Sequence, residues 1–311
     1  MTRNDKPAYD ALRPLKEQLS KRHLGRDGVT GVGMGRTRDR DGRPGPLAVR
    51  FYVENRQHPS VATLPAEVGG WPTEIIQADF RFPEAPARTA RRSSALADTA
   101  RYNPVTGGIS IGPASPAGNG LAGTLGLIVA DASGAPMILT NRHVVGATGD
   151  AVCQPASIDY GGRCANCAVV TQLLLGNYRF QGVWIGIDAA VARFSSWLRA
   201  SSRGTIVGIG AVAGQAAAVE GAPIRKRGRS TGLTQSTVYE VNADVIGANN
   251  VELMNQILIL PQNPPFSAGG DSGSVCVQGN QAVGLLWGHS KNGMGAASPI
   301  GAVLEAFRVQ L

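Results

Sequence analysis

Short apolar runs, separated by glycine and polar turn residues, dominate the chain from residue 107 onward. Each run spans three to seven residues, a length typical of β-strands and too short for most helices. The runs lie at residues 125–130, 137–140, 188–194, 205–209, 256–260, 275–277 and 282–287. Many short strands at this spacing predict a barrel or a sandwich, so we expect a mostly β fold.

The first 81 residues combine a helical pattern with strand patterns. A helix is predicted over residues 7–23, despite a proline at position 14, because four apolar residues share one helical face: Tyr9, Leu12, Leu15 and Leu19. Strands are predicted at residues 29–34, 47–53 and 74–76. We therefore expect a small N-terminal α/β module over residues 1–81.

Two further segments complete this organisation. Residues 82–105 are rich in Pro, Ala, Arg and Ser, a composition typical of a linker or an exposed loop. Residues 106–311 then form the β-rich domain. At its end, residues 299–311 carry apolar side chains at helical spacing, which predicts a C-terminal helix.

The composition is typical of a globular, strand-rich protein. Of 311 residues, 43% are hydrophobic, only 17% are charged and 41 are glycine. No apolar run approaches the roughly 20 residues that span a bilayer, so no membrane association is expected. The N-terminus is polar and shows no secretory signal. We therefore expect a cytoplasmic protein.

The net charge of +8 is concentrated in the first third of the chain. Residues 1–105 carry 18 Lys and Arg against 12 Asp and Glu. A basic surface could attract nucleic acid or an acidic partner. However, these charges are scattered, and no aromatic residues accompany them as a stacking platform. A solvated surface is the better interpretation, and nucleic acid is not expected as a partner.

The four cysteines, Cys153, Cys164, Cys167 and Cys276, are expected to be reduced in a cytoplasmic chain. The first three lie close together in sequence, and a fourth ligand would complete a zinc site. However, there is one Cys-x-x-Cys and no obvious fourth ligand nearby. Free thiols or a local redox-sensitive pair are favoured over zinc, and no metal or other cofactor is expected.

The sequence Gly-Gly-Asp-Ser-Gly-Ser at residues 269–274 places one serine between glycines, directly before an apolar strand. A serine hydroxyl is a weak nucleophile unless a base takes its proton and donors hold the developing oxyanion. Flanking glycines allow a tight turn that aims backbone N–H groups at that oxygen. Ser272 is the candidate nucleophile, and a surface turn is the alternative for the hexapeptide alone.

Of the four histidines, His143 is the candidate base. It lies in a turn directly after an apolar strand, whereas His23 and His58 lie in polar segments of the N-terminal module. A structural role is the usual one for an isolated histidine at a strand end. The presence of the glycine-flanked serine favours catalysis instead.

A catalytic histidine needs an acid that fixes its tautomer and stabilises the imidazolium. Asp188 begins an apolar strand, where burial of a carboxylate is unfavourable without a partner, and His143 would be that partner. Asp150 and Asp159 are the competing candidates. Both lie in glycine-rich loops, where a solvated role suffices.

With their neighbours, His143, Asp188 and Ser272 resemble the trypsin-like, chymotrypsin-fold serine proteases in order and sequence. The similar segments are Thr-Asn-Arg-His-Val, Asp-Ala-Ala-Val and Gly-Asp-Ser-Gly-Ser. The resemblance implies two antiparallel six-stranded β-barrels with the site between them. It implies that Ser272 is the nucleophile, His143 the general base and acid, and Asp188 the orienting acid. The N–H groups of Gly270 and Ser272 would form the oxyanion hole.

Further stretches resemble narrower groups of this family. Gly-Arg-Ser-Thr-Gly-Leu-Thr at residues 228–234 is similar to a segment of bacterial members. Residues 29–33, 49–54 and 71–76 resemble intracellular relatives of the plant narrow-leaf protein. That group carries such a module before the protease and has no signal peptide.

The chain departs from the digestive members at two points. No Ile-Val-Gly-Gly segment precedes the protease domain, so pairing of a freed N-terminus with Asp271 is not supported. Asp271 then needs another partner, or the site is held by its own loops. The floor of the specificity pocket, six residues before Ser272, would be Phe266 rather than an acid. A small or apolar substrate side chain is therefore favoured over Arg or Lys.

The remaining substrate contacts implied by the resemblance lie in one strand. Leu286, Trp287 and Gly288 resemble the segment that pairs with the substrate backbone. His289, beside them, would favour an acidic substrate side chain, and a solvated histidine is the simpler alternative.

These observations favour a cytoplasmic serine endopeptidase that acts on a protein or peptide through an acyl-enzyme. A regulated protease that cleaves a dedicated partner in stress response or phage defence is a second hypothesis. A non-catalytic binding module with the protease fold is a third, although a decoy has no need to keep all three residues. The oligomeric state, the substrate and the activation trigger are left open.

Overall fold

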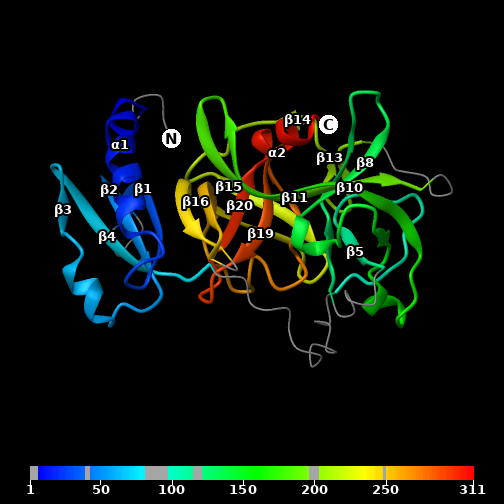
Figure 1. Cartoon of the computed structure of the whole chain (residues 1–311), viewed down its shortest axis with the longest axis horizontal. Helices are drawn as coiled ribbons and strands as arrows, with labels where there is room; N and C mark the ends of the chain where they lie inside the picture. The colour runs from blue at the N-terminus through cyan, green and yellow to red at the C-terminus, as the bar shows by residue number, and fades with distance from the viewer. Residues whose placement is uncertain (1–5, 39–42, 81–96, 115–120, 196–202, 248–249) are drawn as a thin grey trace.

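A computed structural model describes residues 6–38, 43–80, 97–114, 121–195, 203–247 and 250–311. Its N-terminal module, at the left of Figure 1, contains the predicted helix and strands. Helix α1 (Lys6–His23) packs its apolar face on the hairpin of β1 (Val29–Arg38) and β2 (Pro44–Val53). The 3-10 helix η1 (Pro59–Thr63) and the short β3 (Glu67–Val68) lead to β4 (Trp71–Gln77), which pairs with β2 in parallel.

The first barrel follows, at the right of Figure 1. Its strands are β5 (Ile109–Pro113), β6 (Gly123–Leu125), β7 (Leu127–Ala130), β8 (Pro136–Thr140), β9 (Ala151–Cys153), β10 (Asn166–Phe180) and β11 (Val183–Phe194). Their order is β6-β5-β9-β10-β11-β8-β7. Because β6 and β7 are separated only by Gly126, they act as one bent strand that pairs with β5 at one end and β8 at the other. The sheet therefore closes as a six-stranded barrel.

The second barrel is built from β15 (Pro223–Gly228), β16 (Gly232–Ile246), β17 (Glu252–Ile259), β18 (Val275–Gln278), β19 (Gln281–His289) and β20 (Gly295–Pro299). Their order is β15-β18-β19-β20-β17-β16, and β15 also pairs with β16. This pairing closes a second six-stranded antiparallel barrel. Three short strands precede it: β12 (Thr205–Ile206), β13 (Gly210–Ala211) and β14 (Gly214–Gln215). The fold is mostly β, with two barrels, as the sequence predicts.

Helix α2 (Ile300–Phe307) closes the chain and covers the junction of the two barrels. Its buried side chains share one apolar core with β7, β8 and β11 of the first barrel and with β18 and β19 of the second. Separate cores fill the interior of each barrel. Of the helices in the described ranges, neither is long and apolar enough to cross a membrane.

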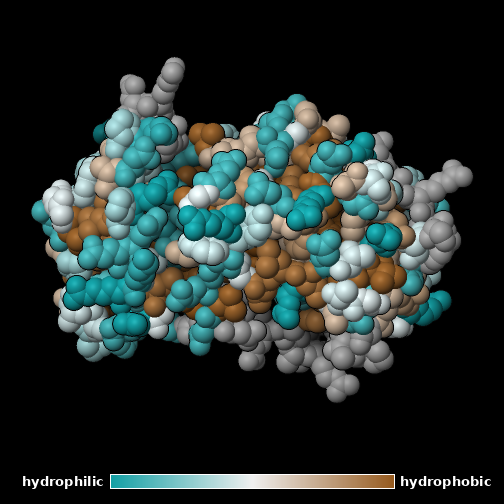
Figure 2. All heavy atoms as spheres, turned by 45° about the horizontal axis from the view of Figure 1, so that its top comes forward, coloured by the Kyte–Doolittle hydropathy of each residue, from teal (hydrophilic) through white to brown (hydrophobic). Residues whose placement is uncertain are grey.

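The N-terminal module continues the sheet of the second barrel, because β1 pairs with β16. Two buried ion pairs reinforce the junction. Lys16 of α1 contacts Asp244, and Arg50 Nη1 lies 3.2 Å from Glu240 Oε2. Elsewhere, hydrophilic residues cover much of the module's visible face (Figure 2).

The division into residues 1–81, 82–105 and 106–311 stays a prediction, since most of the expected linker lies outside the described residues. The part that is described, residues 97–105, contacts both barrels. Tyr102 N donates at 2.9 Å to Gln154 Oε1, just after β9 of the first barrel, and Val105 is buried in the core of that barrel. Asp98 N donates to Arg229 O at 2.8 Å, and the Asp98 carboxylate accepts from Arg227.

Candidate active site

The strand register of the first barrel brings His143 to Asp188. Strand β8 pairs with β11 so that Thr140 lies opposite Ala190. Residues just after Thr140 therefore approach those just before Ala190, and here the chain forms the 3-10 turn η3 (Arg142–Val144). Asn141 fixes the turn by donating from Nδ2 to the Asp188 carbonyl at 2.6 Å.

The carboxylate of Asp188 is fully buried and receives several donors from this turn. His143 Nδ1 lies 2.5 Å from Oδ2, while the backbone N–H groups of Arg142 and His143 donate to Oδ1 at 2.8 and 3.4 Å. A carboxylate only accepts hydrogen bonds, so Nδ1 carries the proton and Nε2 is the basic nitrogen. The His143 side chain is 31% exposed, whereas that of Asp188 is not exposed at all. The His143 ring is therefore partly accessible to solvent, and the buried Asp188 carboxylate fixes its orientation through Nδ1.

Residues 268–274, which carry the candidate nucleophile Ser272 and are called the nucleophile loop below, form two consecutive turns before β18. Asp271 N donates to Ala268 O, and Ser274 N donates to Asp271 O, both at 3.0 Å. Gly270 and Gly273 have φ values of +97° and +94°, which other residues rarely adopt, so the glycines at these positions are required by the turns. Ser272 lies between them, half-buried, with its hydroxyl donating to Trp287 O at 3.2 Å.

Strand β6 of the first barrel holds this loop against the His143 turn. Thr124 N donates to Ser272 O at 2.8 Å. A Cβ atom built on Gly123 would lie 2.4 Å from the Val144 side chain and 3.0 Å from Ser272 O. Both distances are too short, so this position has no room for a side chain. A single glycine therefore lies between the Ser272 backbone and Val144, the residue that follows His143. The structure brings all three predicted triad residues to this one region.

The partner that Asp271 needs is Lys226 of β15. Lys226 Nζ lies 3.2 Å from Asp271 Oδ2, and neither side chain is exposed. Ser230 N and Thr231 N donate to Oδ1 at 2.7 and 3.1 Å, and Ala268 N donates to Oδ2 at 2.9 Å. Burial lowers the pKa of Lys226, and the nearby carboxylate opposes that shift. The loop is thus tied to the barrel by an internal lysine.

Sequence reasoning missed Lys226, although a signal was present. Strand β15 alternates exposed and buried positions, with Ile224, Lys226 and Gly228 on the buried side. The period of two therefore places a lysine on the same face as an isoleucine. A buried lysine needs a carboxylate partner, and Asp271 was the residue without one.

The predicted substrate-binding residues are more buried than a surface pocket would require. Phe266 is fully buried in the core of the second barrel, and Leu286 and Trp287 are 1% and 0% exposed. Gly288 is also buried, whereas His289 is partly exposed. Burial lowers the pKa of His289, and the Asp271 carboxylate opposes this shift. The roles assigned to these residues stay predictions.

Gln256 of β17 is a further residue that the sequence did not single out. It is fully buried, accepts from Trp287 Nε1 at 2.7 Å and donates to Gly186 O of β11 at 2.9 Å. It therefore links the strand that carries Asp188 to the strand whose carbonyl accepts the Ser272 hydroxyl.

Of the competing acids, Asp150 remains in its own loop and accepts from Ala147 N at 2.9 Å. The expectation of a solvated role is wrong for Asp159. Its side chain, in the 3-10 turn η4 (Ser157–Tyr160), is 4% exposed and forms an ion pair with Arg229. The His143 ring is held by Asp188.

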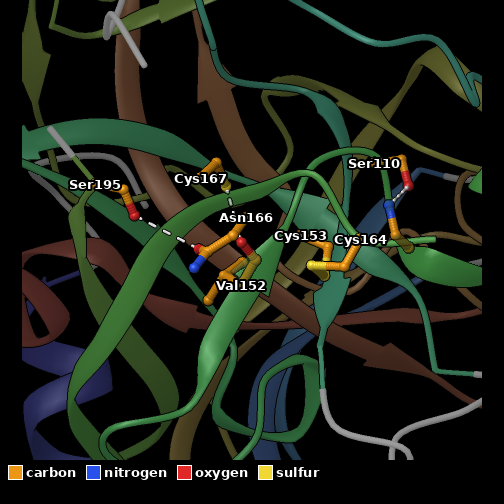
Figure 3. The surroundings of a disulfide bond; sticks show 8 residues. Ser110, Val152, Cys153, Cys164, Asn166, Cys167 and Ser195 are labelled. Atoms are coloured by element: carbon orange, nitrogen blue, oxygen red, sulfur yellow. Dashed lines mark hydrogen bonds between the residues drawn. A yellow bond between two sulfur atoms is a disulfide. The ribbon is translucent and has the colours of Figure 1, made fainter. Parts of the chain in front are cut away.

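The expectation of four reduced cysteines is also wrong, because Cys153 and Cys164 form a disulfide (Figure 3). Spacing along the chain could not reveal this pairing. Cys167 is buried beside it and donates to Val152 O at 3.3 Å, and Cys276 is buried in the second barrel. In the described part of the chain, no three His, Cys, Asp or Glu residues are grouped so as to hold a metal ion. The cytoplasmic location stays a prediction.

No protein-family model and no curated protein matches the chain. Its structure is similar to chymotrypsin-fold serine proteases. A glutamic acid specific serine protease is 22% identical, with a TM-score of 0.49 over 67% of this chain and 100% of that chain. Thermobifida fusca protease A is 21% identical, with a TM-score of 0.49 over 67% and 97%. Cellulomonas bogoriensis chymotrypsin is 19% identical, with a TM-score of 0.45 over the same shares. Similarity at this level carries no evidence on substrate or activity.

Proposed function

We propose that this chain is a serine endopeptidase that hydrolyses peptide bonds through an acyl-enzyme. Ser272 is the nucleophile, His143 the general base and acid, and Asp188 the orienting acid. The observation that carries the proposal is the contact between His143 and Asp188. A fully buried carboxylate lies 2.5 Å from Nδ1 of a histidine that is still accessible. This arrangement leaves Nε2 as a base beside the nucleophile loop.

In the proposed reaction, Nε2 of His143 takes the hydroxyl proton of Ser272 as Oγ attacks the substrate carbonyl carbon. The carbonyl oxygen becomes an oxyanion, which accepts hydrogen bonds from the N–H groups of Gly270 and Ser272. The imidazolium is stabilised by Asp188 and then gives its proton to the departing amine, leaving an acyl group on Oγ. Water, activated by the same nitrogen, releases the acid and restores the serine.

The experiment that tests this function uses a fluorophosphonate probe, which phosphonylates an activated serine with loss of fluoride. The wild type should be labelled, and Ser272→Ala should not be labelled while its thermal unfolding stays close to that of the wild type. Ser133→Ala, in an exposed turn, is the control and should be labelled normally. Labelling that persists in Ser272→Ala would assign the nucleophile elsewhere. A wild type that does not react with the probe would favour the non-catalytic binding module.

The finer parts of the proposal concern substrate and setting. We propose a protein or peptide substrate with a small or apolar side chain at the pocket, because Phe266 occupies the position where an acid would select Arg or Lys. A peptide-library cleavage profile tests this preference, and cleavage after basic residues would contradict it. Kinship with intracellular relatives of the narrow-leaf protein, and with it a cytoplasmic location, is proposed on the N-terminal segments alone. Cleavage of a dedicated partner is proposed on that location and on the absence of an Ile-Val-Gly-Gly segment before the protease domain.

A further inference from the structure

The direction of the Gly270 N–H group depends on one peptide unit, which joins Gly269 to Gly270. The turn from Ala268 to Asp271 is closed by the bond between their backbone groups, and Gly270 has φ of +97°. A positive φ at the third position is typical of a type II turn. In a type I turn this same peptide unit would be rotated by roughly half a turn, so its N–H would point the opposite way. The structure has the type II orientation, and only one of the two orientations open to such a turn can serve a given oxyanion position.

The glycine carbonyls of this turn are held by two hydroxyl groups. Ser230 Oγ donates to Gly269 O at 2.7 Å, and Thr124 Oγ1 donates to Gly270 O at 2.9 Å. Because a trans peptide is planar, the N–H of Gly270 points away from the carbonyl that Ser230 holds. The Ser230 hydroxyl therefore fixes the direction of the Gly270 N–H group.

Arg229 orders both of these hydroxyl groups. Its Nη1 donates to Ser230 Oγ at 3.1 Å, and its backbone N–H donates to Thr124 Oγ1 at 2.9 Å. A hydroxyl has a single hydrogen, and accepting from Arg229 leaves that hydrogen directed to the glycine carbonyl. The Arg229 side chain also lies directly against Gly270, where a Cβ atom would come within 2.9 Å of Nη1.

The guanidinium of Arg229 is itself fixed from the first barrel. Its Nε donates to Asp159 Oδ2 at 2.6 Å, and its Nη2 contacts Asp159 Oδ1. The two side chains are 12% and 4% exposed, and Ser110 Oγ donates to the same Asp159 oxygen at 2.6 Å. Such a two-point contact allows one orientation of the planar group. Asp159 is carried on the loop that the Cys153–Cys164 disulfide closes.

We propose that Arg229 is a positioning residue of the oxyanion turn. Held by Asp159, it orients the Ser230 hydroxyl, which keeps the Gly269–Gly270 peptide in the state that presents the Gly270 N–H to the oxyanion. This inference rests on the proposed protease function, because it assigns a role to the same site. The N–H donors of the oxyanion hole then belong to the second barrel, while Asp159 of the first barrel helps to orient one of them through Arg229.

The fluorophosphonate reaction tests the inference, since the phosphoryl oxygen needs the same N–H donors as the oxyanion. The maximal labelling rate constant, the half-saturating probe concentration and the final labelled fraction are measured for each variant. Loss of one oxyanion donor typically costs about 10²–10³ in rate, so weaker positioning should cost about tenfold to hundredfold. We expect that fall in the rate constant for Arg229→Met and Ser230→Ala, with half-saturation within about twofold of the wild type. A merely structural role would lower the labelled fraction and leave the rate constant unchanged.

Three further variants sharpen the comparison. Ser230→Thr keeps the hydroxyl and should restore most of the rate, so the Ser230 pair decides the question even where an Arg229 variant folds poorly. Asp159→Asn should slow labelling, and adding it to Arg229→Met should cause no further loss if Asp159 acts through Arg229. Arg225→Met is the control, because Arg225 lies on β15, the strand that precedes Arg229, and its guanidinium donates to an exposed loop carbonyl, Gly279 O, at 2.9 Å.

The outcomes separate the inference from the proposed function. A wild type that the probe does not label overturns both. A labelled wild type with unchanged rate constants in Arg229→Met and Ser230→Ala overturns the inference alone. Equal slowing of Ser230→Thr and Ser230→Ala would also overturn it, because the hydroxyl would then not be the group that matters.

Discussion

Lys226 and Asp271 form an ion pair of 3.2 Å beneath the nucleophile loop, and neither side chain is exposed to solvent. The charge that stabilises Asp271 therefore belongs to a strand of the second barrel. Removing one partner of a buried pair leaves the other charge uncompensated, which is strongly destabilising.

Lys226→Met is expected to lower the free energy of unfolding by about 3–5 kcal/mol and to abolish fluorophosphonate labelling. Urea denaturation measures the first effect. The double variant Lys226→Met/Asp271→Asn leaves no buried charge and should be less destabilised than the single variant. Equal destabilisation of the two would show that the ion pair is not the reason for the loss.

Asp188→Asn should reduce the labelling rate constant by about 10⁴-fold, the size of effect seen when the orienting acid of such a triad is replaced by an amide. The reason is that the amide no longer fixes Nδ1–H or stabilises the imidazolium. Thermal unfolding of the variant verifies that it is folded. Asp150→Asn serves as the control, because that carboxylate caps its own loop at Ala147 N. If Asp150→Asn lowered the labelling rate constant as much as Asp188→Asn does, the assignment of Asp188 as the orienting acid would be contradicted.

Thiol counting tests the cysteine arrangement. Burial raises the pKa of Cys167 and of Cys276 to about 12, so neither thiol should react with iodoacetamide in the folded protein at neutral pH. In urea without reductant two thiols should be alkylated, and after reduction four. Reduction should also lower the free energy of unfolding by about 2 to 3 kcal/mol, because the disulfide closes a short loop. Four reactive thiols before reduction would rule out the Cys153–Cys164 bond.

His289 should make the protein sensitive to acid. Burial lowers its pKa below the ordinary value of 6.5, so the unfolded chain binds a proton at this residue at a higher pH than the folded chain does. The neutral form of His289 therefore supports the folded state above about pH 6.5. The free energy of unfolding decreases as the pH falls through and below that value, because the unfolded chain then gains a proton that the folded chain does not bind. The unfolding free energies of wild type and His289→Gln, measured from pH 7.5 to 5, should show a smaller decrease in the variant. Parallel curves for the two proteins would exclude this contribution.

Much of the fold follows from local pattern. Short apolar runs predict the strands of both barrels, and an acid in one of these runs identifies Asp188, because a buried carboxylate requires donors. The pattern of Gly270 and Gly273 around Ser272 likewise predicts the turns, since both positions need a positive φ. These features depend on neighbouring residues and can be read along the chain.

Most of the remaining features depend on contacts between distant segments. The Asp159–Arg229 pair joins residues 70 positions apart and is set by how segments align in space, so the sequence favoured a solvated acid. The Cys153–Cys164 bond is local, with a separation of 11, but it requires a geometry that spacing alone does not give, so the sequence favoured free thiols or a redox-sensitive pair. Lys226 could have been found, because its alternating strand marks it as buried, but only the fold shows that Asp271 is its partner. Non-local pairing is the part that one sequence leaves undetermined.

The pairing of β1 with β16 has a consequence for how this chain can change over generations. If residues 1–81 were lost, Asp244 and Glu240 would remain in the second barrel without Lys16 and Arg50, their buried counter-charges. The edge of β16 that β1 covers would also be exposed, inviting pairing with other chains. Recombination that removes the N-terminal segment would therefore leave the second barrel with uncompensated buried charges and an open strand edge. The N-terminal module and the second barrel depend on each other at these ion pairs, so a substitution at Lys16 or Arg50 limits what Asp244 or Glu240 can become, and the reverse.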